Sequence, residues 1–174
     1  MPSTVRERHC QSPIANATRY VDIFGEVENE ISLTWDEFNA LPRSENVQDI
    51  HCVTRWSRFD TAFEGVHWRE LAALARPKPS ARFAVAWAEH DFTSNVPIAS
   101  LEDDLALLAT HADGEPLPLD HGFPLRLVIP HKYFWKSAKW LRGIELLPVD
   151  RPGFWERYGY HNDADPWQEE RYSF

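Results

Sequence analysis

The chain has 174 residues, of which 43% are hydrophobic and 13% aromatic, so it is long enough to form one domain with a substantial core. Its formal net charge of −9 argues against nucleic acid or an anionic membrane as the main partner. No apolar run approaches the roughly 18 residues of a membrane span, and the first residues lack the apolar stretch of an export signal. We therefore expect a cytoplasmic protein with reduced thiols.

Hydrophobic periodicity and capping signals predict many short elements. In chain order they predict strands at 20–25 and 31–33, a helix from Thr34 to about Leu41, a strand at 47–53, a helix at 68–75, a strand at 82–88, a helix at 100–112, a strand at 125–129, one or two helical turns at 133–141, and a strand at 144–147. The segment 34-TWDE-37 has the residues of a capping box, and Ser100 is the expected cap of the later helix.

These elements, with 13 prolines, predict a loop-rich α+β domain with mixed β-sheets and short helices. We expect a single domain over residues 1–174. Residues 1–19 and 163–174 are its candidate extended or loosely packed ends, because they show little periodicity.

Cys52 lies in the segment 50-IHCVTRWS-57, and Cys10 is the only other cysteine. A lone intracellular cysteine on a strand is typical of a packed core residue. A catalytic thiol needs a histidine partner, but the side chain of His51 points to the opposite face of a strand. A zinc site needs further ligands, and the chain has no CxxC or HExxH motif. The residues alone leave the role of Cys52 open.

The window from His121 to Ile144 contains no Asp or Glu. Its basic residues are Arg126, Lys132, Lys136, Lys139 and Arg142, together with His121 and His131. The three lysines have a helical spacing and could share a face. Arg126 lies on a core-like strand, where a charge needs a partner. Arg126, Ser137 and Lys139 could bind a phosphate, with a solvated basic face as the alternative.

Four segments together resemble one family: 50-IHCVTRWS-57, 65-GVHW-68, 121-HGFPLRLVIPHKYFWKSAKWLRGIE-145 and 152-PGFWERYGYHNDADPWQEERY-172. They are similar to the sulfite oxidase-like, molybdopterin-dependent oxidoreductases, and most similar to the short branch that consists of the molybdopterin domain only. The resemblance runs from about Tyr20 to Tyr172. It implies a sulfite oxidase-type α+β fold and a cofactor of molybdenum with molybdopterin, without a nucleotide extension.

The resemblance also implies roles for individual residues. Cys52 matches the cysteine that gives its thiolate sulfur to molybdenum, which suits a metal that combines soft sulfur with hard oxo ligands. The HGxPxR and S-x-K motifs that bind the cofactor place its contacts at His121, Arg126, Ser137, Ala138 and Lys139.

On the substrate side, the family places an arginine and a tyrosine near the metal. Arg55 and Tyr160 are the matching candidates, with Tyr158 as the competitor of Tyr160. Nothing in residues 1–19 resembles the pterin-contacting segment of the longer relatives. We therefore expect Asn162, with His161, to supply that contact from the other end of the chain.

The implied activity is two-electron oxygen-atom transfer on a small oxyanion or an S- or N-oxide. An external electron carrier, which is a haem or flavin protein or a quinone, completes the reaction. Two alternatives stay open. One is a non-enzymatic module that binds a phosphate-bearing ligand or a protein through residues 121–144. The other is an enzyme with Cys52 as nucleophile and a distant histidine as base.

Overall fold

The computed structural model describes residues 20–174, so Cys10 and the predicted extended end at 1–19 lie outside the described residues. In chain order the elements are β1 (Tyr20–Gly25), β2 (Ile31–Thr34), α2 (Trp35–Asn39), β3 (Ser44–His51), β4 (Ser57–His67), α3 (Trp68–Ala75), β5 (Phe83–Ala88), η2 (Glu89–Asp91), β6 (Thr93–Pro97), α4 (Ile98–Glu102), β7 (Leu107–Ala112), β8 (Glu115–Pro116), η3 (Leu119–His121), β9 (Arg126–Val128), η4 (Phe134–Lys136), β10 (Leu141–Leu147) and α5 (Phe154–Arg157). None of the helices in this range is long and apolar enough to cross a membrane.

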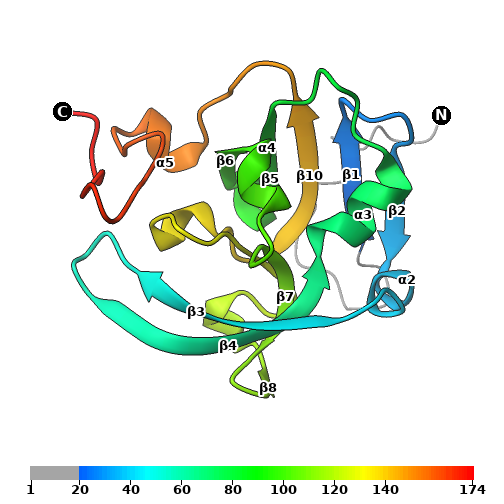
Figure 1. The fold of residues 1–174 in the computed structure, drawn as a ribbon, viewed down its shortest axis with the longest axis horizontal. Coiled ribbons are helices and arrows are strands. Elements are labelled where there is room, and N and C mark those ends of the chain that lie inside the picture. The colour runs from blue at the N-terminus through cyan, green and yellow to red at the C-terminus, as the bar shows by residue number, and fades with distance from the viewer. Residues whose placement is uncertain (1–19) are drawn as a thin grey trace.

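The strands form two sheets (Figure 1). The first has the order β2-β1-β10-β5-β6, with β1 and β10 parallel and the other pairs antiparallel. The second has the order β3-β4-β7-β8, and β9 also pairs with β7. In Figure 1 the long β3–β4 hairpin reaches away from the first sheet toward the C-terminal tail. This mixed arrangement with few short helices is the predicted α+β class.

Several local predictions are confirmed. The strand at Tyr20–Gly25 and the helix at Trp68–Ala75 have the predicted bounds. Thr34 and Glu37 form the predicted capping box, each accepting a backbone N–H of the other. The strand expected at 47–53 exists, but it runs from Ser44 to His51 and is not buried throughout, since Val47 is 56% exposed.

The helix predicted at 100–112 is wrong. Only Ile98–Glu102 is helical, Ser100 does not cap it, and Leu107–Ala112 is the strand β7. Leu107 and Ala109 pack in one apolar cluster, whereas Leu108 packs in the other. Because both faces of β7 are buried, its sequence shows the continuous apolar run that a buried strand shares with a buried helix.

Candidate functional site

Cys52 lies in the turn of the β3–β4 hairpin. Its N–H donates to the carbonyl of Trp56 at 2.9 Å, and its carbonyl accepts from the N–H of Arg55 at 3.1 Å. Arg55 has a left-handed backbone with φ 72°, a conformation that closes tight turns. The half-buried sulfur contacts the hydroxyl of Thr54 at 3.0 Å. The hairpin thus holds the thiol at its tip, between two cavities.

The larger cavity has a volume of about 560 Å³, within the range of ligand sites. Besides Cys52, it is lined by five of the six residues that sequence reasoning assigned to cofactor binding: His121, Arg126, Ser137, Ala138 and Lys139. These residues come from the hairpin, η3, β9 and the segment after η4. The structure therefore brings the cysteine and the basic segment together, although about 70 residues of sequence separate them.

Gly122 allows the two halves of the basic segment to approach each other. It has φ +110°, and a Cβ at this position would lie 3.2 Å from the Cα of Lys139 and 3.1 Å from the Cβ of Arg126. A side chain would be both strained and crowded there. The glycine of the HGxPxR motif thus lets its turn lie directly against Lys139.

Arg126 is a buried cation that has no counterion among residues 20–174. It is only 5% exposed, and its guanidinium donates to the carbonyls of His121 and Ser137, both at 2.9 Å, rather than to any carboxylate of residues 20–174. Burial lowers the pKa of Arg126 to about 9, so it is charged at neutral pH. Burial, followed by the nearby Arg126, also lowers the pKa of Lys139. Asp120 partly opposes this lowering. Two cations that form no salt bridge with a carboxylate of residues 20–174 favour a bound anion such as a phosphate.

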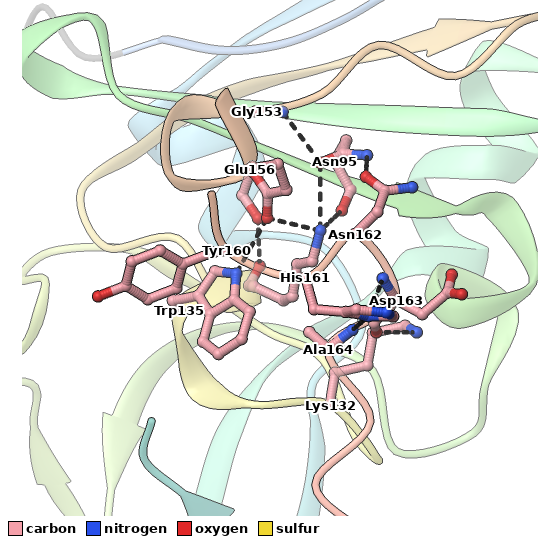
Figure 2. A network of polar contacts seen from close by, with 12 residues as sticks. Asn95, Lys132, Trp135, Gly153, Glu156, Tyr160, His161, Asn162, Asp163 and Ala164 are labelled. Carbon is pink, nitrogen blue, oxygen red and sulfur yellow. Dashed lines mark hydrogen bonds and ion pairs between the residues drawn. The ribbon is translucent and has the colours of Figure 1, made fainter. Parts of the chain in front are cut away.

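Another cation of the basic segment, Lys136, forms a buried ion pair with Glu156. Lys136 is fully buried, and its Nζ lies 2.6 Å from Oε1 of Glu156. The same oxygen accepts the indole N–H of Trp135 at 2.9 Å. Burial, partly opposed by Glu156, lowers the pKa of Lys136. Because Trp135 lines the larger cavity, this pair fixes part of the cavity wall, and Figure 2 shows Glu156 and Trp135 in this network.

The predicted common face of the three lysines is wrong, because the segment has only the short η4 turn and not a helix. Lys132 donates to the carbonyl of Asp163 at 2.8 Å, and Lys139 donates to that of Asp120 at 2.9 Å. Lys136 points to Glu156. Only Lys139 lines the larger cavity.

The other nominated residues differ in placement. Arg55 lines the smaller cavity beside Cys52. Tyr160 lines neither cavity, but its ring packs on Trp135 and Trp155, with centroids 5.0 and 4.9 Å apart, and both tryptophans line the larger one. Its pKa is raised by burial first, and then by Tyr172 and Cys52.

The structure does not bring Asn162 to either of these cavities. Its amide nitrogen donates to Asp150 at 2.7 Å and its oxygen accepts from Asn95 at 2.8 Å, as Figure 2 shows for Asn95. His161 turns its Nδ1 toward Glu170 at 3.3 Å. Tyr158, the competitor of Tyr160, is largely exposed. The pterin contact of Asn162 therefore stays a prediction without geometric support.

Sequence reasoning missed Arg171 and Tyr133. Both line the smaller cavity, which has a volume of about 320 Å³. Arg171 donates to the carbonyls of Cys52 at 3.3 Å and Val53 at 2.8 Å. No periodicity marks the tail, and the only available signal was the concentration of aromatic residues in 152–174, whereas the structure packs Arg171 against the hairpin turn and not as a loose end.

The contacts of Cys52 do not form a nucleophile with its base. Its sulfur contacts Thr54, and the adjacent His51 uses its Nδ1 on the hydroxyl of Ser57 at 2.8 Å. The larger cavity instead combines the half-buried thiol of Cys52 with a buried arginine that has no carboxylate partner among residues 20–174. This combination suits a bound cofactor better than it suits a cysteine nucleophile. Such a ligand has a thiophilic metal centre and an anionic group, and molybdenum bound to molybdopterin has both.

Comparisons with known proteins point the same way. The family described as oxidoreductase molybdopterin binding domain matches residues 9–155. The uncharacterized oxidoreductase YuiH of Bacillus subtilis is 46% identical over 154 residues, which cover 88% of this chain and 78% of YuiH.

The chain is also similar, at lower identity, to longer proteins. Human mitochondrial sulfite oxidase is 28% identical over 75% of this chain and 29% of its own. The protein-methionine-sulfoxide reductase catalytic subunit MsrP of Campylobacter jejuni is 25% identical over 84% of this chain and 56% of its own. The crystal structure of the sulfane dehydrogenase SoxCD from Paracoccus pantotrophus superposes with a TM-score of 0.75 at 22% identity, over 86% of this chain and 43% of that chain. This superposition confirms the predicted fold.

Proposed function

Because the chain belongs to the oxidoreductase molybdopterin binding domain family, we propose that it catalyses two-electron oxygen-atom transfer on a small oxyanion or an S- or N-oxide. Membership makes the chain a molybdenum-dependent oxidoreductase and confirms the resemblance seen in the sequence. The curated relatives sulfite oxidase and MsrP are longer than this chain, so the reaction and substrate are part of the proposal.

The observation that carries the proposal is the placement of Cys52 at both cavities. The larger cavity, with Arg126 and Lys139, suits the phosphate of molybdopterin, and His121, Ser137 and Ala138 line the same wall. The smaller cavity gives a substrate access to the other side of the sulfur. Cys52 would hold the metal, which supplies the oxygen-transfer chemistry when bound.

The protein residues have separate tasks in this reaction. Arg126 and Lys139 bind and orient the cofactor through its anionic end. Tyr160 packs against Trp135 and Trp155 and lines neither cavity, so its hydrogen bond on the substrate side stays a prediction from the resemblance. Oxidation of a substrate takes an oxygen atom from water and releases two protons and two electrons, and reduction reverses this balance. The electrons require an external carrier, which we propose to be a haem or flavin protein or a quinone.

Turnover by purified, molybdenum-loaded protein tests the proposal. Sulfite with ferricyanide as acceptor tests oxidation, and dimethyl sulfoxide or trimethylamine N-oxide with a reduced viologen dye tests reduction. We expect one of these assays to show turnover that depends on molybdenum content. A protein that contains stoichiometric molybdenum and turns over none of the three probes would contradict the proposal.

The role of Arg126 gives a second test. Replacing Arg126 by Gln should lower the share of chains that retain molybdopterin, because a buried charge-assisted contact to the phosphate is worth about 1.5–3 kcal/mol, or more than tenfold in affinity. Cofactor content is measured as the fluorescent oxidation product of the pterin. Arg69→Gln, on the exposed side of α3, is the matched control. Equal pterin content in Arg126→Gln and Arg69→Gln would remove Arg126 from the cofactor site.

Family membership argues against the non-enzymatic module that residues 121–144 left open in the sequence, because the family is one of oxidoreductases. Action in the cytoplasm remains a prediction from the sequence.

A further inference from the structure

Residues 160–172, which we call the tail loop, fold into a loop with contacts of its own, beyond the residues that the family match covers. Tyr160 and Tyr172 form an antiparallel bridge at the base of this loop. Beside the bridge, the N–H of His161 donates to the carbonyl of Arg171 at 3.2 Å. Because these contacts lie within the loop, it can dock on the domain or separate from it as one unit.

The tail loop contacts both of the segments that form the larger cavity. On one side, Arg171 donates to the carbonyls of Cys52 and Val53 at 3.3 and 2.8 Å, and both of these residues line that cavity. On the other side, the carbonyl of Ala164 accepts the N–H of Tyr133, in the basic segment, at 2.7 Å. The docked loop therefore joins the hairpin turn that carries the thiol to the basic segment.

A chain of amide contacts connects the tail loop to the interior as well, and in Figure 2 Asn95 lies between Gly153 and Asn162. Asn95 is 1% exposed, and its Oδ1 accepts from Nζ of Lys136 at 3.1 Å and from the N–H of Gly153 at 3.0 Å. Its Nδ2 donates to Asp150 and to Asn162, both at 2.8 Å. Asn162 in turn donates to the second oxygen of Asp150 at 2.7 Å.

Both asparagines in this chain of contacts have only one possible orientation. The ammonium of Lys136 only donates, so Asn95 must turn its oxygen toward it. The ionised carboxylate of Asp150 only accepts, so both asparagines must turn their nitrogens toward it. Asn162 therefore presents its oxygen to Asn95, and its place is tied to that of Lys136. Lys136 directly precedes residues 137–139, which line the larger cavity.

We propose that the docked tail loop retains the molybdenum cofactor, and that Asn162 is the positioning residue that couples the loop to residues 137–139. The loop holds the Cys52 turn and residues 137–139 in fixed positions, so a cofactor bound between them is released slowly. Because coupling between two sites is reciprocal, the bound cofactor also stabilises the docked loop. The inference rests on membership of the family and goes beyond the proposed reaction.

Hydrogen exchange in the tail loop tests the coupling without turnover. In the wild type, the amides of the loop should exchange about fivefold more slowly with the cofactor bound than without it, which corresponds to one hydrogen bond of ordinary strength. Asn162→Ala removes the contact to Asn95, so the difference should shrink to less than about twofold. Exchange is measured on molybdenum-loaded protein and on protein from a host that does not make the cofactor.

Release of the cofactor from loaded protein is the second measurement. Asn162→Ala should lose its pterin about fivefold faster than the wild type, as measured by the fluorescent oxidation product that stays with the protein. Gln168→Ala is the matched control, because Gln168 belongs to the same loop and its amide donates to Asp165 within the loop. This control should release the pterin at the wild-type rate.

An exchange of the two polar partners separates positioning from a general loss of structure. Asn162→Asp alone sets two carboxylates against each other and should release the pterin at least as fast as Asn162→Ala. Asn162→Asp combined with Asp150→Asn keeps an acceptor for each N–H of Asn95 and reverses only the bond between positions 150 and 162. The double variant should return to within about twofold of the wild-type rate.

Three results would overturn the inference. They are equal exchange of the tail loop in loaded and cofactor-free wild type, pterin release from Asn162→Ala within about twofold of Gln168→Ala, and a double variant that releases as fast as Asn162→Asp. Loaded protein that passes these tests but turns over no probe would contradict the proposed function alone. A chain that takes up no cofactor would contradict both proposals.

Discussion

Replacement of Cys52 by Ser is expected to abolish turnover while the fold is retained. Cys52 lies in a hairpin turn and is only half-buried, so a serine fits without repacking the core. A serine hydroxyl is a poor replacement for a soft thiolate on molybdenum. Replacing a residue that only hydrogen-bonds to a metal ligand already lowers metal affinity or activity roughly 10–100-fold. Loss of the ligand itself should therefore lower kcat by more than about 100-fold.

Cys10→Ser, which changes the other cysteine of the chain, is the control for thiol chemistry in general. The assay uses whichever of the three probes the wild type turns over. A Cys52→Ser enzyme with more than about a tenth of the wild-type kcat would show that the thiolate is dispensable, because a lost metal ligand should cost more than that.

Breaking the Lys136–Glu156 pair should cost more stability than any surface change. Lys136→Met leaves Glu156, whose side chain is 3% exposed, as a buried charge without its partner. It also removes the donor to the backbone and side-chain oxygens of Asn95. Removal of one partner of a buried ion pair costs about 3–5 kcal/mol, or roughly 10 °C in Tm for a domain of this size.

The double variant Lys136→Met with Glu156→Gln is the matched comparison. It removes both charges and keeps an oxygen that can accept the indole N–H of Trp135. We expect it to recover part of the lost free energy of unfolding, since buried pairs can often be replaced at little cost. A single variant that loses less than about 1 kcal/mol would mean that water reaches Glu156 and that the pair does not hold this wall.

The parts of the site that follow from local motifs were predictable. The resemblance identified Cys52 and the basic residues His121, Arg126 and Lys139, and the structure places all four at one cavity. This worked because each motif combines side chains with the backbone they require, as with Gly122 and its positive φ. The capping box at Thr34 was predictable for the same reason.

The missed features depend on contacts between distant segments. Leu107–Ala112 is a strand because β4 and β9 pair with it, and its own apolar run does not distinguish strand from helix. Lys136 looked like a solvated lysine because its partner, Glu156, lies twenty residues later. Arg171 contacts Cys52 across 119 residues, and nothing local in the tail indicates such a contact.

The most direct test of the account is X-ray absorption at the molybdenum edge, measured on the wild type and on Cys52→Ser purified from a host that makes the cofactor. If Cys52 is the metal ligand, the wild type contains stoichiometric molybdenum, and this metal has one sulfur neighbour more than any molybdenum that Cys52→Ser retains. The same sulfur shell in both proteins, or no molybdenum in the wild type, would contradict the assignment of Cys52 as the metal ligand.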